Sequence, residues 1–288
     1  EGGAVYLTDI EGGGKSHHLS ELKIVLLGYK RAGKSSSGNT ILGREEFDTV
    51  GRTAQCVKRQ GQVAGRQVTV VEAPGWWRNV PNIPNTPELT KNEIELSVSL
   101  CPPGPHALLL VVCVDTPFTE TEKRLVQQHL ELLRERVWSH TIVLFTCGDL
   151  LGDTPIEQHI KTEGKSLQWL VEKCGNRYHV LNNQKREDHM QVTQLMEKIE
   201  EMVAGNRGRH YEMERQRGKI LEEKRWRDEE RVKERMMKVK IDRESLRSLM
   251  GELRISYSTT SLLLLVSNGL YISFLYTNKE IGEKEEER

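Results

Sequence analysis

Residues 22–43 have the sequence LKIVLLGYKRAGKSSSGNTILG. The first six of them are rich in Leu, Ile and Val, which predicts a strand buried on both faces of a parallel sheet. A turn containing glycine follows, and the residues after it predict a helix that ends at Gly43. A buried strand, a glycine turn and a helix in this order form the structural context of a phosphate-binding loop.

The turn itself matches the phosphate-loop pattern Gly-x-x-x-x-Gly-Lys-Ser. Gly28 and Gly33 let the backbone direct its N–H groups toward phosphate oxygens, at the positive end of the following helix. Lys34 is expected to bridge the β- and γ-phosphates, and the Ser35 hydroxyl to bind Mg²⁺. The residues predicted to hold the nucleotide here are Gly28, Tyr29, Lys30, Arg31, Ala32, Gly33, Lys34, Ser35 and Ser36.

Strand-like and helix-like segments alternate after this loop, as they do in an α/β fold. A hairpin is predicted from residue 57 to residue 72 with its turn at Ala64-Gly65, and further strands at 107–114, 141–145 and 178–181. Helices are predicted near 89–100, after a capping box at Thr119 to Glu122, and at 190–204. We therefore assign residues 21–205 to one α/β domain, with a mostly parallel sheet flanked by helices.

The strand that ends at Glu72 supplies two more candidates. GTPases carry Asp-x-x-Gly at this place, with a carboxylate that reaches Mg²⁺ through water and a glycine N–H that senses the γ-phosphate. This sequence has Glu72-Ala73-Pro74-Gly75, in which Glu72 keeps the charge on a side chain one methylene longer. Glu72 is thus a candidate for the metal site, and Gly75 for the nucleotide site.

The segment after Gly75 contains Trp76, Trp77 and three prolines, at 81, 84 and 87. These prolines exclude a regular helix or a central strand. A loop at this place could act as a switch that responds to the γ-phosphate. The two Trp side chains could instead simply pack against a neighbouring helix, and the sequence favours neither interpretation. His129, on the inner stripe of the helix after Thr119, is more typical of a packing residue than of a ligand.

Base recognition is assigned to residues that follow the later strands. Asp149 could accept two hydrogen bonds from the N1 and N2 edge of guanine, which adenine cannot supply. An Asp after a strand is also a common turn residue, so an ATP-binding protein remains a weaker alternative. Asn183 follows the last predicted strand and is expected to make a second contact with the base.

These segments, together with Pro103 to Val112 (PGPHALLLVV) and Phe118-Thr119, resemble the immunity-associated GTPase family, the GIMAP or IAN proteins. The stretch from Gly104 to Val112 is the box that separates this family from other small GTPases. The resemblance implies a Ras-like P-loop GTPase domain of the AIG type, with an extra insertion between the last strands. It also implies GTP or GDP and Mg²⁺ as ligands, and homo- or hetero-oligomers with related GTPases that assemble across the nucleotide.

Several family positions are altered in this chain. The switch-one threonine falls at Lys58, which cannot coordinate a cation as a hydroxyl does. Thr49 or Thr53 could substitute if the loop shifts, and Thr49 is included among the candidate nucleotide-binding residues. Cys147, also included, stands where many GTPases carry a Lys along the base, and Trp76 stands in place of the Gln that orients water. Because these changes affect hydrolysis more than binding, no catalytic residue is assigned. A slow GTPase switch and a GTP-binding assembly module without hydrolysis both remain open.

Composition limits the classes of partner. The chain has 288 residues with 42 basic and 42 acidic side chains, a balance that does not favour nucleic acid, and none is predicted as a partner. The five cysteines form no Cys-x-x-Cys pair and no cluster with metal-ligand spacing. Cys113 lies in an apolar run, which predicts a small core residue and a reducing compartment.

The remaining segments lie outside the α/β domain. Residues 1–20 are predicted to be a flexible leader and residues 206–255 a long charged helix, whose apolar seam could pair as a coiled coil or lie back on the domain. Residues 261–276 form the most apolar run and precede a charged tail at 277–288. This run is shorter than the roughly 20 residues of a spanning helix, which favours a shallow or partial membrane insertion over a spanning helix. Packing of this run on protein is the alternative to membrane association. A cytoplasmic location is expected, either free or on the cytoplasmic face of an organelle membrane. The apolar seam of the charged helix at 206–255 consists of Val232, Met236, Val239, Leu246, Met250 and Leu253.

Overall fold

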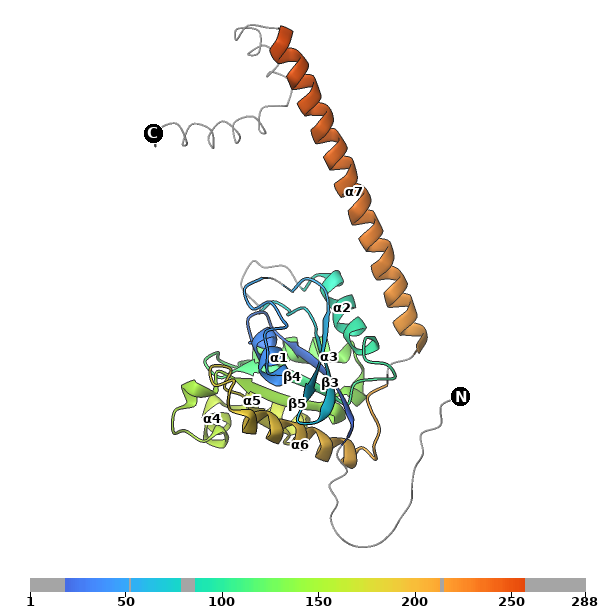
Figure 1. Cartoon of the computed structure of the whole chain (residues 1–288). Coiled ribbons are helices and arrows are strands. Elements are labelled where there is room, and N and C mark those ends of the chain that lie inside the picture. The colour runs from blue at the N-terminus through green and yellow to red at the C-terminus, as the bar shows by residue number, and fades with distance from the viewer. Residues whose placement is uncertain (1–18, 52, 79–85, 213–214, 257–288) are drawn as a thin grey trace, which may run out of the picture. The chain divides into compact units, whose positions relative to one another are not determined.

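Figure 1 presents a computed structural model that describes residues 19–51, 53–78, 86–212 and 215–256. Its sheet has six strands in the order β2-β3-β1-β4-β5-β6, with helices flanking it. The strands are β1 (Glu21–Gly28), β2 (Val57–Val63), β3 (Arg66–Glu72), β4 (Ala107–Cys113), β5 (Thr141–Thr146) and β6 (Tyr178–Val180). All neighbouring pairs are parallel except β2 with β3. The predicted α/β fold is confirmed.

The helices occupy the places that the sequence predicts, and two more lie between β5 and β6. They are α1 (Lys34–Leu42), α2 (Glu88–Ser99), α3 (Glu120–Glu131), α4 (Ile156–Glu163), α5 (Lys165–Lys173), α6 (His189–Gly205) and the short 3-10 helices η1 (Glu135–His140) and η2 (Gly148–Leu151). The predicted capping box is present, with Thr119 and Glu122 bonding each other's backbone at the start of α3. Helices α4 and α5 lie between β5 and β6, where the family resemblance implies an insertion.

The core lies around the central strands. Every residue of β4 is buried, and in β1 only Glu21 and Lys23 are partly exposed. Strands covered by helices on both faces read as nearly continuous apolar runs, which is the pattern that the sequence shows here. The carboxyl ends of β1, β3, β4 and β5 meet at one edge, the usual position of ligands in an open parallel sheet.

The β2-β3 hairpin turns at Ala64 and Gly65, both with positive φ (49° and 77°), as tight hairpin turns require. This turn fixes a register in which Val57 lies opposite Glu72 and Lys58 opposite Val71. Lys58 is exposed on the edge strand, and the loop before Val57 runs toward Glu72 at the end of β3.

Close backbone packing explains why residue 104, just before β4, is a glycine. Gly104 is buried, and a Cβ atom built on it would lie 1.8 Å from the carbonyl oxygen of Tyr211. The Tyr211 N–H donates to the carbonyl of Pro105 at 2.8 Å, and the Tyr211 ring is buried. The chain that leaves α6 is therefore packed directly on the backbone of the loop that enters β4.

Replacing Gly104 with alanine should lower the free energy of unfolding by about 3 kcal/mol, because the methyl group would displace the backbone of Tyr211. Urea denaturation measures the loss. Gly205→Ala is the matched control, since Gly205 ends α6 with nothing within 4 Å of its Cβ position. Equal losses for the two variants would contradict the packing explanation.

The charged helix α7 (Arg215–Ser256) begins later than predicted. Residues 206–212 are turn and extended chain, because Tyr211 is anchored in the core rather than carried on a helix. Contacts divide the chain into two units, Glu1–Glu223 and Lys224–Arg288. The seam residues Val232, Met236, Val239, Leu246 and Met250 are exposed along α7.

The predicted leader at 1–20 lies almost entirely outside the described residues, and the apolar run at 261–276 and the tail at 277–288 lie wholly outside them. Within the described ranges, no helix has both the length and the apolar character needed to cross a membrane.

Candidate functional site

The phosphate loop joins β1 to α1 at the ligand-binding edge of the sheet. Gly28 (φ 150°) lies so close to β4 that a Cβ atom would be 2.6 Å from the Val111 carbonyl oxygen. Gly33 (φ 95°) lies against Thr146, whose hydroxyl donates to the carbonyl of Ala32 at 2.7 Å. The loop is thus fitted onto the ends of β4 and β5, and the positions predicted from 28 to 36 lie together around it.

Lys34 is the first residue of α1 and the buried one of the loop's charged residues. Its side chain is buried, and its ammonium group donates to the carbonyl of Tyr29 at 3.0 Å. Burial lowers the pKa of Lys34 to about 8, against the opposing charge of Glu72. A buried cation of this kind is stabilised by an anionic ligand, which supplies the charge compensation that water cannot.

Ser35 and Glu72, the two residues predicted to hold a metal ion and here called the metal pair, are in hydrogen-bond contact. The Ser35 hydroxyl donates to Glu72 Oε1 at 2.8 Å, and burial raises the pKa of Glu72 against that hydrogen bond and the charge of Lys34. A hydroxyl beside a carboxylate provides hard oxygen ligands of the kind that Mg²⁺ prefers. The side chains present therefore fit a magnesium ion.

The switch-one position has three candidates in the sequence, Lys58, Thr49 and Thr53. Thr53 donates its hydroxyl hydrogen bond to Glu72 Oε1 at 3.3 Å and lies partly buried beside the metal pair. Thr49 is exposed in a bend, and Lys58 is exposed on β2. The hydroxyl at the site is therefore Thr53, because the hairpin register brings the residues just before β2 to the end of β3.

The segment after β3 touches the phosphate loop directly. The Lys30 N–H donates to the carbonyl of Trp76 at 2.8 Å, and a Cβ atom on Gly75 would lie 2.7 Å from the Lys34 ammonium nitrogen. The Trp76 ring is buried and stacks on His129 of α3, with 4.6 Å between ring centroids. Trp76 thus packs as one interpretation predicted, His129 is a packing residue, and residues 79–85 of the predicted switch lie outside the described residues.

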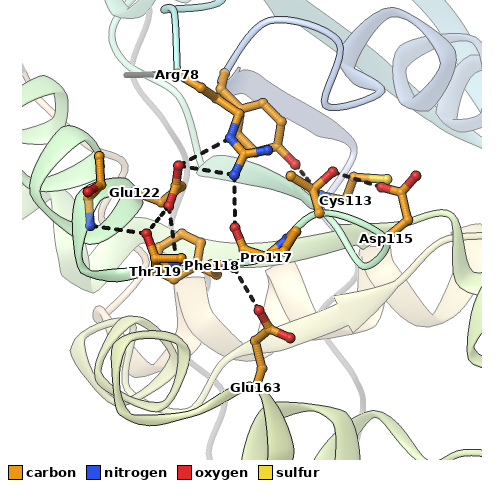
Figure 2. A network of polar contacts seen from close by, with 11 residues as sticks. Arg78, Cys113, Asp115, Pro117, Phe118, Thr119, Glu122 and Glu163 are labelled. Atoms are coloured by element: carbon orange, nitrogen blue, oxygen red, sulfur yellow. Dashed lines mark hydrogen bonds and ion pairs between the residues drawn. The ribbon is translucent and has the colours of Figure 1, made fainter. Parts of the chain in front are cut away.

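Arg78 was not among the sequence candidates, yet it links several loops at this edge. Figure 2 shows its guanidinium between Glu122, at 3.0 and 3.2 Å, and the carbonyl of Pro117, at 2.9 Å. It also lies 5.4 Å from the centre of the Tyr29 ring in the phosphate loop. Burial raises the pKa of Glu122, but hydrogen bonds from Thr119 and Arg78 outweigh it, so this pKa lies below its usual value. In the sequence, the only sign that Arg78 belongs to the site is its position three residues after Gly75.

The predicted base-recognition residues are at the ends of β5 and β6. Asp149 lies in η2 with an exposed side chain, and within the described residues no hydrogen bond to its carboxylate is found. Asn183 is held by α1, since its Oδ1 accepts from Thr40 at 2.8 Å and its amide nitrogen lies 3.4 Å from Ser37 Oγ. The structure thus leaves Asp149 available to a base and places the Asn183 side chain against the helix.

Cys147, which the sequence analysis placed along the base, is bonded to another cysteine. It forms a disulfide with Cys113, across 34 residues of sequence, with a Cα–Cα distance of 5.8 Å. The prediction of a small core residue at Cys113 is confirmed by its burial, but spacing along the chain does not show the disulfide, because it does not show that β4 and β5 are neighbours. Adjacent parallel strands bring the two side chains together where both strands end.

Two curated proteins illustrate the similarity of this chain to known sequences. Human GTPase IMAP family member 8 is 33% identical over 196 residues, covering 66% of this chain and 28% of that protein. Immune-associated nucleotide-binding protein 9 of Arabidopsis thaliana is 31% identical over 199 residues, covering 65% of this chain and 57% of that protein. The chain therefore spans less than two thirds of the length of either relative.

Solved structures share the fold. Toc33 from Arabidopsis thaliana in complex with GDP and Mg²⁺ superposes with a TM-score of 0.53 at 14% identity, covering 65% of this chain and 86% of that chain. The fold is accordingly that of the Ras-like P-loop GTPases. The model of the AIG1 family matches residues 22–231, most of the sequence, and the chain belongs to the AIG1 family.

Proposed function

We propose that this protein binds GTP and GDP with Mg²⁺. The observation that carries the proposal is the buried Lys34 ammonium in a glycine-shaped loop, beside the Ser35–Glu72 oxygen pair. Together these groups provide a cation and a hydroxyl for the phosphates and a carboxylate for the metal. The relatives whose names include "GTPase" or "nucleotide-binding" support the same assignment.

Competition for a fluorescent GDP analogue tests both the nucleotide and the base. GTP and GDP should displace the analogue at concentrations at least about a hundredfold lower than ATP, because only guanine can donate two hydrogen bonds to Asp149. Equal displacement by ATP would support the weaker alternative, an ATP-binding protein. No binding of any nucleotide would overturn the proposal itself.

The proposed function has two possible forms, which differ in whether the protein hydrolyses GTP. Trp76 stands where a water-orienting Gln would lie, and its buried ring packs on α3. One form is a slow GTPase switch completed by a second subunit, and the other is an assembly module that uses bound GTP without turnover. One solved neighbour concerns chloroplast translocon components for which dimerization is important for GTPase activity, which favours testing the first form.

Single-turnover GTP hydrolysis at low and high protein concentration distinguishes these forms. A rate that rises with protein concentration supports a homo-oligomer that completes the site, and a mixture with a related GTPase tests the hetero-oligomer. The absence of hydrolysis at every concentration would exclude the GTPase switch and leave the assembly module.

Glu72→Gln should raise the Mg²⁺ concentration needed for half-maximal GTP binding by about tenfold, since it removes the negative charge beside Ser35 while keeping a similar shape. A magnesium titration monitored with the fluorescent analogue measures the change. Glu131→Gln is the matched control, because Glu131 is exposed at the end of α3. Identical magnesium titrations for the two variants would remove Glu72 from the metal site.

A further inference from the structure

The Cys113–Cys147 pair lies between the two segments that the proposed function uses. Cys113 ends β4, and its backbone N–H donates to the Tyr29 hydroxyl of the phosphate loop at 3.0 Å. Cys147 follows β5 and directly precedes the helix η2 that carries Asp149. Figure 2 shows Cys113 beside Asp115, in the loop that leaves β4. A covalent bond at this place joins the phosphate side of the site to the base side.

The backbone conformation of Cys147 explains how such a bond could hold the turn that contains Asp149. Cys147 has φ 60°, a left-handed conformation that residues with a Cβ atom adopt at a cost. Its carbonyl accepts from the Leu150 N–H at 2.9 Å, which closes the turn that contains Asp149. Fixing the Cys147 side chain to β4 therefore holds a conformation that the unlinked residue would adopt less often.

Accessibility distinguishes Cys147 from the other cysteines, because Cys113 is buried at the end of β4. Cys147 is partly exposed, whereas Cys56, Cys101 and Cys174 are buried and form no disulfide. Burial raises the pKa of Cys101 and that of Cys174 to about 12, which leaves their thiols unreactive near neutral pH. An oxidant in solution would thus reach Cys147 first, with Cys113 beside it as the resolving thiol, and leave the thiols of Cys101 and Cys174 unchanged.

We propose that Cys113 and Cys147 form a reversible redox site in which the disulfide slows the release of guanine nucleotide. This inference rests on the proposed nucleotide-binding function. The disulfide keeps the Asp149 turn in the conformation that receives the base, and reduction lets the turn relax. Disulfides in a reducing compartment are usually transient and redox-sensing, so the expected location and this bond are compatible.

Glutathione disulfide is a sufficient oxidant. The Cys147 thiolate attacks one of its sulfur atoms, forms a mixed disulfide and releases one glutathione thiolate. The Cys113 thiolate then attacks the Cys147 sulfur atom and releases the second glutathione. The two cysteine thiols lose two protons and two electrons, and one glutathione disulfide becomes two glutathione molecules. A dithiol reductant reverses both steps.

Asp115 raises the competing assignment of a metal site. Its carboxylate and the two sulfur atoms all lie within 4.8 Å of one another, and it is the third donor of this group among the described residues. Structural zinc sites use four protein ligands, and here the sulfur atoms are already joined to each other. These observations favour the disulfide over a metal site.

The test uses the full chain loaded with fluorescent GDP, either reduced by dithiothreitol or oxidised by glutathione disulfide. Release is followed after adding excess GDP, and the thiol state is measured by mass spectrometry after alkylation. Release should be about fivefold slower in the oxidised protein, as expected when the freedom of one ordered side chain is removed in advance. Cys113→Ser should release at the rate of the reduced protein under both conditions. Cys174→Ser, the matched control, should keep the response.

Four other outcomes of this experiment would overturn the proposed redox site, each for a different reason. Pair thiols that stay free in glutathione disulfide would exclude the redox site. A disulfide that forms without changing release would exclude its control of the nucleotide. Protection of the pair from alkylation by Zn²⁺ alone, in the reduced protein, would assign the sulfur atoms to a metal. Lack of nucleotide binding in both redox states would instead overturn the proposed function, and this inference with it.

Discussion

Lys34→Ala is expected to weaken GTP binding by at least about a hundredfold, equivalent to about 2.7 kcal/mol. The lost group is an ammonium that would donate charge-assisted hydrogen bonds to the phosphates from a buried position, where such bonds are strong. The variant should remain folded, because it removes a cation that burial already disfavours. Displacement of fluorescent GDP measures the affinity, and thermal unfolding checks the fold.

Lys58→Ala is the matched control for the same charge change. Lys58 is exposed on the edge strand β2 and lies opposite Val71, so GTP affinity should stay within about twofold of the original. This control also tests the switch-one register, since a large effect at Lys58 would restore the position first inferred from the sequence. An unchanged affinity in Lys34→Ala would remove the lysine from the site.

The pH dependence of binding gives an independent check on Lys34. Its pKa is about 8 without ligand, and bound phosphate would raise it, because a nearby negative charge favours the ammonium form. The contribution of Lys34 to affinity is therefore fully present below pH 8 and is lost as pH rises through the raised pKa of the complex. Lys34→Ala should not show this loss above pH 8.

Features that depend on neighbouring residues in the chain are predictable from the sequence. The phosphate loop is determined by glycines within eight residues of one another, and both have the positive φ that the turn requires. The capping box at Thr119 and the hairpin turn at Ala64-Gly65 are equally local, and both were predicted at the correct residues. In each case the backbone geometry follows from neighbours along the chain rather than from tertiary packing.

The errors concern contacts between segments distant in sequence. The choice between Thr49 and Thr53 could have been made by counting back from the hairpin turn, because Val57 lies opposite Glu72 and the preceding loop must then reach the metal pair. The Cys113–Cys147 bond had no comparable signal, since it depends on which strands are adjacent. The late start of α7 depends on the burial of Tyr211 beneath the loop at Gly104, which no propensity predicts.

Asp149→Asn is expected to reduce GDP affinity by about a hundredfold while increasing affinity for xanthosine diphosphate. Guanine offers the N1–H and N2–H donors, and a carboxylate accepts both. Xanthine has a carbonyl oxygen at position 2 in place of the amino group. The Asn amide can accept from N1–H and donate to that oxygen, so the two nucleotides should exchange their order of affinity.

Asp153→Asn is the matched control, because Asp153 is exposed just beyond η2 and its substitution removes the same negative charge. It should leave GDP affinity within about twofold of the original, since an exposed charge outside the base contact contributes little. If Asp149→Asn weakened both nucleotides equally, the side chain would support the turn rather than read the base. If neither affinity changed, the exposed carboxylate of Asp149 would have no part in the site. Exchange of preference alone requires a direct contact, because general damage to the loop cannot strengthen the binding of xanthosine diphosphate.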